Sequence, residues 1–267
     1  MTSSLPPILL VGFGKMGGAM FAGWRERGVA PSLAIDPALP DAPGAEPTIL
    51  AEAAAIPADF APAAVVLAVK PQNAAATLPH YARFAGRAVF LSIMAGRSLA
   101  GMRALLGENA AIVRAMPNTP AAIRQGITVA CAGPGVSAAQ RALCDSLLAA
   151  VGTVAWVEDE SLIDPVTAVS GGGPAYVFLL AELLERAAVE QGIPPDLARA
   201  LARQTVAGSG ALLAASPEDA AALRRAVTSP KGTTEQALAV LMADEAWPAL
   251  ISRAIEAATR RSRELAG

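Results

Sequence analysis

The chain has 267 residues, which is long enough for one large domain or two ordinary ones. Although 54% of the residues are hydrophobic, only 4% are aromatic and 16% are charged, so we expect a core of small aliphatic side chains and a surface partly buried between subunits. The net charge of −2 and the lack of any basic run argue against nucleic acid as a partner.

The sequence gives no sign of a metal site, a disulfide framework or a targeting segment. It has one histidine, and Cys131 and Cys144 lie thirteen residues apart, so we expect both cysteines to be reduced core residues. Residues 1–4 carry no basic region, and the apolar run at 8–11 is too short for a signal peptide. No apolar run approaches the roughly eighteen residues that span a membrane. We therefore expect a soluble cytoplasmic protein without membrane contact.

In the first part of the chain, short apolar runs alternate with helical stretches. Helices are expected, for example, over residues 98–106 and 138–151. This alternation predicts an α/β fold with a mainly parallel, doubly wound sheet, and we assign residues 1–157 to a Rossmann-type dinucleotide-binding domain. The expected strands cover residues 8–11, 33–35, 65–69, 89–92, 112–116, 127–131 and 154–157.

After Glu158 the strand pattern stops, and we assign residues 158–267 to an all-helical domain. A second sheet domain was the alternative, but the 3.6-residue spacing of apolar positions favours helices. Several helices are rich in alanine and apolar on more than one side, which favours burial against a second copy of the chain. The expected helices cover residues 174–191, 196–215, 217–227, 234–242 and 245–265.

The first apolar run leads into a glycine-rich turn and then into a helix over residues 16–27. Gly12 permits the turn, Gly14 lets the backbone approach a pyrophosphate, and Gly17 lets the helix pack closely on the strand. The helix start faces the phosphates with open amides and partial positive charge. A purely structural turn is the alternative, but the order of strand, turn and helix favours a dinucleotide site. The turn reads Gly12-Phe13-Gly14-Lys15-Met16-Gly17.

Asp36 ends the second expected strand, a little over twenty residues after Gly12. An acid at this position can accept hydrogen bonds from the adenosine ribose and repels a 2′-phosphate. The next arginine in the sequence is Arg83, so no guanidinium follows closely. Asp36 therefore favours NADH over NADPH, although an ordinary strand-end turn before Pro37 would also explain an aspartate here.

Two further strands end in loops that can reach a ligand, because the carboxyl ends of parallel strands open toward the ligand crevice. Lys70, one of only three lysines, follows a buried strand. Asn118 lies between two prolines that fix the backbone, and its side chain can cap the turn or contact a ligand. A solvated lysine and a rigid turn are the alternatives.

The helical half holds two more candidate segments. Ser170-Gly171-Gly172-Gly173-Pro174 is expected to be a flexible turn before a helix, where glycines let a ligand approach, or else a tight helix corner. Residues 228–236 combine hydroxyls, a glycine and Lys231 at a helix start, which favours a carboxylate. Thr233 and Gln236 fit a capping box, which would explain those two residues without a ligand.

In this order, the segments resemble pyrroline-5-carboxylate reductase, the enzyme family of the last step of proline biosynthesis. The glycine-rich turn is shared by many dehydrogenases, whereas the Val-Thr-Ser-Pro-x-Gly-Thr-Thr and Ser-Gly-x-Gly-Pro-Ala-Tyr stretches are much more specific. The matching segments are residues 12–16, 68–72, 92–96, 114–119, 170–176, 204–208 and 227–234.

The resemblance implies hydride transfer from NAD(P)H to the C=N carbon of the cyclic imino acid, and a helical domain that joins two subunits into a homodimer, with dimers often forming larger rings. The substrate site would comprise Ser229, Lys231, Gly232, Thr233 and Thr234, with the Thr234 hydroxyl orienting or protonating the nitrogen. The cofactor site would comprise Gly12, Phe13, Gly14, Lys15, Met16, Asp36, Ala68, Val69, Lys70, Pro71, Ala95, Asn118, Ser170 and Gly171.

Three residues depart from the pattern of that family. Gly172 stands where serine is common, Lys231 stands where glycine is usual, and Asp36 stands where family members often carry residues suited to NADPH. A 3-hydroxyacid dehydrogenase is the nearest enzymatic rival, because it pairs a similar glycine loop with a helical domain. Such enzymes use a lysine on a helix of the second domain as acid/base, whereas the second half of this chain has only Lys231, in a loop. A non-catalytic nucleotide sensor would have no reason to carry the cluster at residues 228–234.

Overall fold

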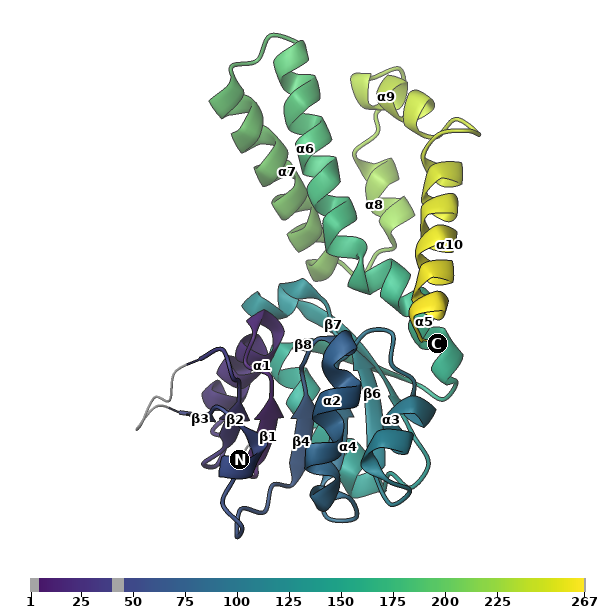
Figure 1. Ribbon diagram of the computed structural model, residues 1–267. Coiled ribbons are helices and arrows are strands. Elements are labelled where there is room, and N and C mark those ends of the chain that lie inside the picture. Colours follow the sequence, from purple (N-terminus) through teal and green to yellow (C-terminus); the bar gives the residue numbers. More distant parts are fainter. Residues whose placement is uncertain (1–4, 40–45, 267) are drawn as a thin grey trace. The chain divides into compact units, whose positions relative to one another are not determined.

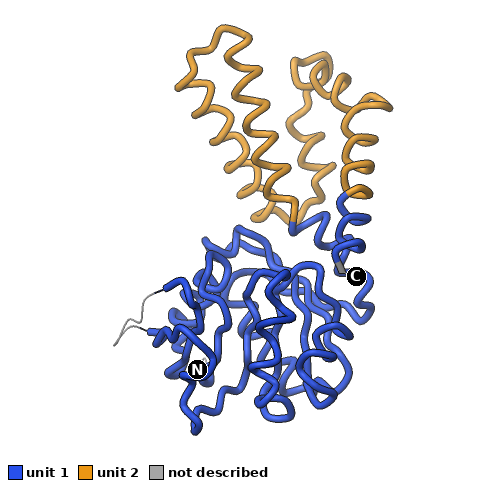
Figure 2. The backbone as a smooth tube through the Cα atoms, in the orientation of Figure 1, with its two compact units in different colours: residues 1–171, 258–267 blue, residues 172–257 orange. Residues whose placement is uncertain are grey.

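The computed structural model describes residues 5–39 and 46–266, and the chain divides into two compact units (Figure 2). The Rossmann unit comprises residues 1–171 and 258–267, and the helical unit comprises residues 172–257. These units do not follow the boundary that we drew after Val157. The difference arises because the segment after Val157 packs on the sheet, and because the last turns of the final helix return to the Rossmann unit.

The Rossmann unit contains one eight-stranded sheet with the order β3-β2-β1-β4-β5-β6-β7-β8 (Figure 1). All neighbouring strands are parallel except β6 and β7, which confirms a mainly parallel, doubly wound sheet. All seven expected strands are present, and β3 was missed. The strands are β1 Ile8–Val11, β2 Leu33–Ile35, β3 Thr48–Leu50, β4 Ala64–Leu67, β5 Val89–Ser92, β6 Ala111–Met116, β7 Gly126–Ala132 and β8 Gly152–Val157.

The central strands are buried on both faces because helices cover each side of the sheet. Side chains alternate along a strand, so Ile8 and Leu10 face one core while Leu9 and Val11 face the other. Helices α1 and α4 contribute to the first core, and α2 and α3 lie with the second. Fully apolar strands are typical of parallel sheets covered on both faces. The helices are α1 Lys15–Glu26, α2 Ala74–Thr77, α3 Leu99–Leu106 and α4 Ala138–Leu148.

The helical unit consists of helices and their connections, and the structure describes no strand after Val157. Each helix expected from the sequence is present within a few residues of its predicted limits. The helices after β8 are α5 Ile163–Val166, α6 Gly173–Glu190, α7 Pro195–Ala215, α8 Ala220–Ala226, α9 Thr233–Leu241 and α10 Trp247–Ala266.

The glycine segment before α6 is helical, so the expectation of a flexible turn there is wrong. Residues Thr167–Gly171 form a π-helical turn that links α5 to α6, and Gly172 has helical backbone angles, φ −80° and ψ −22°. A Cβ on Gly171 would lie 2.7 Å from Cε of Met116, the flexible end of that side chain. π-Turns inside helices are frequent at functional sites.

This continuous helical run also corrects the expectation about membrane-spanning length. Residues 160–190 are long and apolar enough to cross a membrane by length and composition, with only 6% of the most apolar window buried. The run contains Asp164, which is buried and hydrogen-bonded to Ser262. The apolar side chains of this run are exposed in a single chain. Exposed apolar surface of this kind is typical of contact with another subunit as well as of contact with a bilayer.

Both cysteines are free and buried, which confirms their expected place in the core. Burial raises the pKa of the Cys144 thiol to about 12, and burial with the nearby Glu160 carboxylate raises the pKa of Cys131. Neither thiol is therefore activated as a nucleophile, because the thiolate is the reactive form.

Candidate cofactor and substrate sites

The loops that follow β1, β2, β4 and β5 meet at one edge of the sheet because these strands are parallel. A backbone hydrogen bond joins each loop to the end of the neighbouring strand. The N–H of Gly12 donates to Ile35 O at 2.8 Å, that of Ala68 to Val11 O at 2.8 Å, and that of Ile93 to Leu67 O at 3.1 Å. The chain order reverses between β1 and β4, and ligands of doubly wound sheets bind at such a switch point. Gly12 directly follows β1 and Ala68 directly follows β4, so both residues lie at this switch point.

The three glycines of the first turn differ in what surrounds them. Gly12 has φ +97°, and a Cβ there would lie 2.7 Å from the Ala68 carbonyl oxygen. A Cβ on Gly17 would overlap the Gly12 carbonyl oxygen, whereas nothing lies within 4 Å of a Cβ on Gly14. Gly12 and Gly17 are therefore required by the packing of turn, helix and strand. Gly14 leaves an open approach to the backbone, which fits a pyrophosphate.

Helix α1 begins directly at this opening. Gly14 is its N-cap and offers no capping side chain, and its first turn contains no acid. The first amides of the helix are thus open to an anion, and the helix dipole favours one. Lys15 is exposed, while the ring of Phe13 packs on Phe21 with centroids 6.0 Å apart.

Asp36 is held by two backbone amides. Its Oδ2 accepts the N–H of Phe13 at 2.9 Å, and its Oδ1 accepts the N–H of Ala38 at 3.0 Å. The hydrogen bond from Ala38 supports the strand-end turn that we gave as the alternative explanation of Asp36. A carboxylate has about four acceptor sites, so two remain for other donors. Asp36 thus supports the turn and keeps capacity for a ribose hydroxyl.

The loops after β4 and β5 are tied together. Arg97 Nε donates to the carbonyl oxygen of Pro71 at 3.0 Å. Ala68 and Val69 are half-buried, and the exposed Lys70 precedes a 3-10 turn at Pro71–Asn73. Ala95 lies two residues before Arg97, so the structure brings these predicted cofactor residues to the same edge as Gly12.

The predicted residues Asn118, Ser170 and Gly171 also belong to the Rossmann unit. Asn118 Oδ1 accepts the Ile127 N–H at 3.0 Å, which orients its amide group after β6. A Cβ on Gly171 would lie 2.7 Å from Cε of Met116, the last residue of β6. The Ser170 hydroxyl donates to Val166 O at 3.1 Å within the helical run.

The predicted substrate residues at 229–234 lie in the helical unit, at the start of α9. The N-cap is Gly232 and not Thr233, so the predicted capping box of Thr233 and Gln236 is wrong. Instead, Glu235 Oε2 accepts the N–H of Lys231 at 2.8 Å. Because Gly232 has no capping side chain, the first amides of α9 are open to an anion. Ser229 accepts the Gly232 N–H through its carbonyl oxygen at 3.0 Å.

Lys231 adopts a left-handed backbone conformation, with φ +60°. This conformation favours glycine, and a non-glycine residue there costs about 1–3 kcal/mol of backbone strain. The lysine places a flexible, exposed cation beside the open end of α9.

Sequence reasoning missed two arginines of the Rossmann unit. Arg114 lies within the buried strand β6, and its Nη1 donates to Glu160 Oε1 at 2.8 Å. A charge inside an apolar strand was the signal that could have identified it. Arg124 has φ +63° and forms two hydrogen bonds with Glu26 near the end of α1, and this pair lowers the pKa of Glu26. No sequence pattern pointed to that pair.

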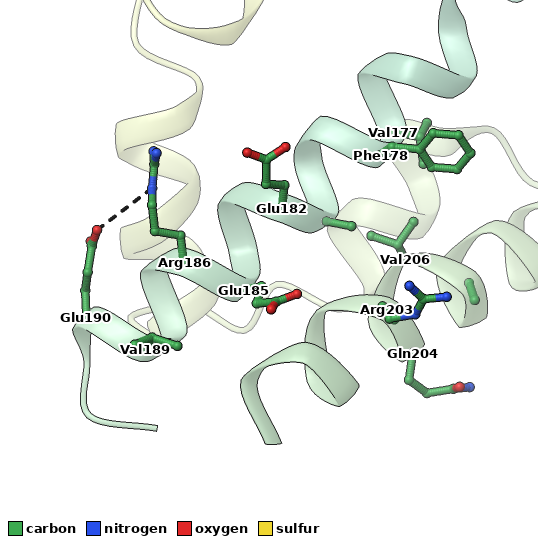
Figure 3. A pocket seen from close by; sticks show the side chains of 12 residues that line it. Val177, Phe178, Glu182, Glu185, Arg186, Val189, Glu190, Arg203, Gln204 and Val206 are labelled. Carbon is green, nitrogen blue, oxygen red and sulfur yellow. Dashed lines mark ion pairs between the residues drawn. The ribbon is translucent and has the colours of Figure 1, made fainter. Parts of the chain in front are cut away.

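The helical unit also has a groove of about 1010 Å³ between α6 and α7 (Figure 3). Apolar side chains such as Phe178, 66% exposed, lie in it beside charged ones such as Glu182 and Arg203. None of the predicted substrate or cofactor residues lines this groove. Helix α6 has no buried residue, as expected for a helix that becomes covered by another subunit.

A glycine-rich turn at the switch point of a doubly wound sheet, followed by an all-helical unit, defines a dinucleotide-dependent oxidoreductase. The family description "Pyrroline-5-carboxylate reductase dimerisation" matches residues 160–265. Pyrroline-5-carboxylate reductase of Pseudomonas aeruginosa is 39% identical, with 98% of each chain aligned. The chain belongs to the pyrroline-5-carboxylate reductase family.

Solved structures agree with this assignment. The chain is similar to pyrroline-5-carboxylate reductase of Coxiella burnetii, at 31% identity with a TM-score of 0.87 over 100% of both chains. Pyrroline carboxylate reductase of Plasmodium falciparum, solved with NADP bound, is 25% identical with a TM-score of 0.83, covering 98% of this chain and 99% of that one. The predicted class, an NAD(P)H-dependent oxidoreductase acting on a C=N bond, is thus confirmed, as is a region for homo-oligomer formation.

Proposed function

We propose that the chain reduces 1-pyrroline-5-carboxylate to L-proline, with NADH as the preferred reductant. The observation that carries the proposal is the combination of an open glycine-rich turn with the family match over the whole chain. When bound, the reduced nicotinamide supplies the hydride that adds to the C=N carbon. The chain itself supplies two anion sites, one at the start of α1 and one at the start of α9.

The first anion site holds the cofactor. The open amides at the start of α1 bind the pyrophosphate at Gly14, where the backbone is accessible. The loops at Ala68–Pro71 and Ala95 line the cleft, and Asn118 and Gly171 lie toward the nicotinamide end. This assignment is supported by the order of the strands, because residues 68–71, Ala95 and Asn118 follow β4, β5 and β6, and Gly171 lies against Met116 at the end of β6.

Asp36 supports the preference for NADH. Its carboxylate is fixed by the backbone of Phe13, so it cannot easily turn away from a 2′-phosphate. The sequence between residues 37 and 69 contains no lysine or arginine, while it contains four acids, so that stretch offers no cation to a 2′-phosphate. Like charges at short distance are unfavourable, and ribose hydroxyls gain hydrogen bonds from the same carboxylate.

The second anion site holds the substrate carboxylate. The open amides at the start of α9, with the Lys231 ammonium, supply positive charge for it. Thr233 and Thr234 provide hydroxyls there, and no hydrogen bond within the described chain engages either hydroxyl. The Thr234 hydroxyl orients the imine nitrogen. An imine can enter already protonated, so this chemistry needs no strong protein acid.

Homodimer formation through the helical unit completes the proposal. Large apolar side chains are exposed along α6 and α7, including Phe178 and Leu212 at 66% and 56% exposure. A second copy of the chain would bury them. We place the enzyme in the cytoplasm, where reduced thiols such as those of Cys131 and Cys144 persist.

The test is a coupled measurement of nucleotide oxidation and product. Purified protein with 1-pyrroline-5-carboxylate should oxidise NADH and form L-proline in equal amounts, with a higher kcat/KM for NADH than for NADPH. The absence of proline with either nucleotide would refute the reaction. Proline formation with a higher kcat/KM for NADPH would refute only the cofactor preference.

A further inference from the structure

The last turns of α10 belong to the Rossmann unit, although the helix begins in the helical unit (Figure 2, blue end of α10). We propose that this end of α10 positions the loop at residues 93–97, which carries Ala95, in the form that receives the cofactor. The proposal rests on the cofactor site proposed above. Two sets of contacts within the Rossmann unit carry it.

The first contact is polar and buried. Ser262, only 6% exposed, donates its hydroxyl to Asp164 Oδ1 at 2.7 Å. The same Asp164 oxygen lies 3.8 Å from Nη2 of Arg114, whose side chain is 4% exposed. A buried carboxylate that loses a donor is costly, so the Ser262 hydroxyl fixes α10 to this pair.

Further polar contacts lead from Arg114 to the start of α3, just after the loop at residues 93–97. Arg114 Nη1 donates to Glu160 Oε1 at 2.8 Å, and the same Glu160 oxygen accepts the N–H of Leu99 at 2.8 Å. Leu99 is the first residue of α3 and follows the loop by two positions. Ser262 is thus connected to the start of α3 through the side chains of Asp164, Arg114 and Glu160, although Nε and Nη2 of Arg114 have no hydrogen-bond partner among the described residues. Polar contacts of this kind restrain the segments they join.

The second set of contacts acts on the middle of the loop. Gly96 has φ +62°, and a Cβ there would lie 3.1 Å from Cβ of Leu265. Leu265 therefore packs directly on the loop backbone. The adjacent Arg97 donates to Pro71 O at 3.0 Å, so the same loop also restrains the Lys70–Pro71 loop. Both loops of the proposed cleft are thereby linked to the end of α10.

This arrangement gives Ser262 and Leu265 a positioning role, since neither belongs to the proposed cofactor contacts. It also connects the dimerisation region to the cofactor loops, because α10 is one helix with a part in each unit. Loss of the Ser262 hydrogen bond or of the Leu265 packing should increase the mobility of residues 93–97 before that of other segments, because both contacts restrain this loop.

The experiment compares Ser262→Ala with Ser252→Ala in the full-length protein. Ser252 is a matched control on the same helix, exposed, with its hydroxyl bonded to Pro248 O at 3.0 Å. Amide hydrogen exchange without any nucleotide should become faster in peptides covering 92–98 in Ser262→Ala and stay unchanged in Ser252→Ala. The Kd for NADH should rise roughly three- to tenfold in Ser262→Ala only, with the KM for the imine within about twofold of the wild type.

A second variant guards against general unfolding of the first. Leu265 is 57% exposed and lies near the end of α10, so a variant that ends at Glu264 should fold, and it should accelerate exchange at 92–98 alone. Unchanged exchange at 92–98 in the variant that ends at Glu264, or equal behaviour of the two serine variants, would overturn the proposal. Because exchange is measured without ligand, this result is independent of whether the wild type reduces the imine.

Discussion

The carboxylate of Asp36 accepts the backbone N–H of Phe13 at 2.9 Å, across the gap between β2 and the glycine-rich turn. This bond fixes the acid that ends β2 beside the turn that follows β1. A second amide, that of Ala38, holds the other oxygen at 3.0 Å. The charge that we propose selects between the two nucleotides is therefore held by these two amides in the protein without a nucleotide.

Replacing Asp36 by serine should shift the cofactor preference toward NADPH. Removal of the negative charge ends the repulsion of a 2′-phosphate, so kcat/KM for NADPH should rise about tenfold, or ~1.4 kcal/mol, relative to that for NADH. Steady-state kinetics with both nucleotides measures this ratio. Asp59→Ser removes an exposed acid of the same unit and should leave the ratio unchanged. A wild-type enzyme that already prefers NADPH would contradict the role of Asp36.

Two neighbouring glycines of α1 should respond to alanine in opposite ways. A Cβ at Gly17 overlaps the Gly12 carbonyl oxygen, while nothing lies within 4 Å of a Cβ at Gly18. Gly17→Ala should lower the free energy of unfolding by about 1–3 kcal/mol and weaken NADH binding. Gly18→Ala should stabilise the protein by about 0.5–1 kcal/mol, because alanine favours a helix interior. Denaturant titration and NADH titration of both variants test this, and equal effects would show that Gly17 is not a packing site.

Much of the fold was predictable because its sequence signals are local. Strand β1, for example, matches its predicted limits, since four apolar residues run directly into Gly12. β3 was missed because Thr48–Leu50 is an edge strand whose residues are exposed or half-buried, so it lacks the buried apolar run that marks the central strands. The segment around Gly171 was predicted as a turn from its glycines, but Thr167–Gly171 form a π-helical turn that leads into α6. A run of glycines does not by itself distinguish a turn from a helix.

The two candidate sites were predictable to different degrees. The glycine-rich turn was located residue by residue, because each glycine has a distinct geometric role. At α9 the pattern of Thr233 and Gln236 indicated a helix start one position late, since Gly232 is the N-cap and Glu235 bonds to Lys231. The link from Ser262 to Asp164 joins residues 98 positions apart and left no signal in the sequence.

Thr234→Ala should lower kcat about tenfold while the Kd for NADH stays the same. In the proposed reaction the hydroxyl acts on the imine, so its loss should affect the chemical step and not nucleotide binding. Thr234→Ser should retain most of the activity. Thr153→Ala, at an exposed position on β8, controls for the loss of a threonine elsewhere. An unchanged kcat would leave Thr234 without a part in the reaction.

Lys231→Gly should weaken substrate binding and strengthen the fold. Loss of the ammonium should raise the KM for the imine about three- to tenfold at low salt, with less effect at high salt because the charge is exposed. Glycine relieves the φ of +60°, so the free energy of unfolding should rise by about 1 kcal/mol. Lys15→Gly is not a suitable control because Lys15 is in the cofactor turn, so Lys231→Arg, which keeps the charge, serves instead. An unchanged KM in Lys231→Gly would remove Lys231 from the substrate site.

The destination of the hydride tests the central claim most directly. The enzyme would be supplied with 1-pyrroline-5-carboxylate and NADH carrying deuterium at both C4 positions, and the product would be analysed by mass spectrometry and NMR. The account predicts L-proline heavier by one deuterium, located on the ring carbon bonded to nitrogen that does not bear the carboxylate. Unlabelled proline, or no proline at all, would contradict direct hydride transfer to the C=N carbon.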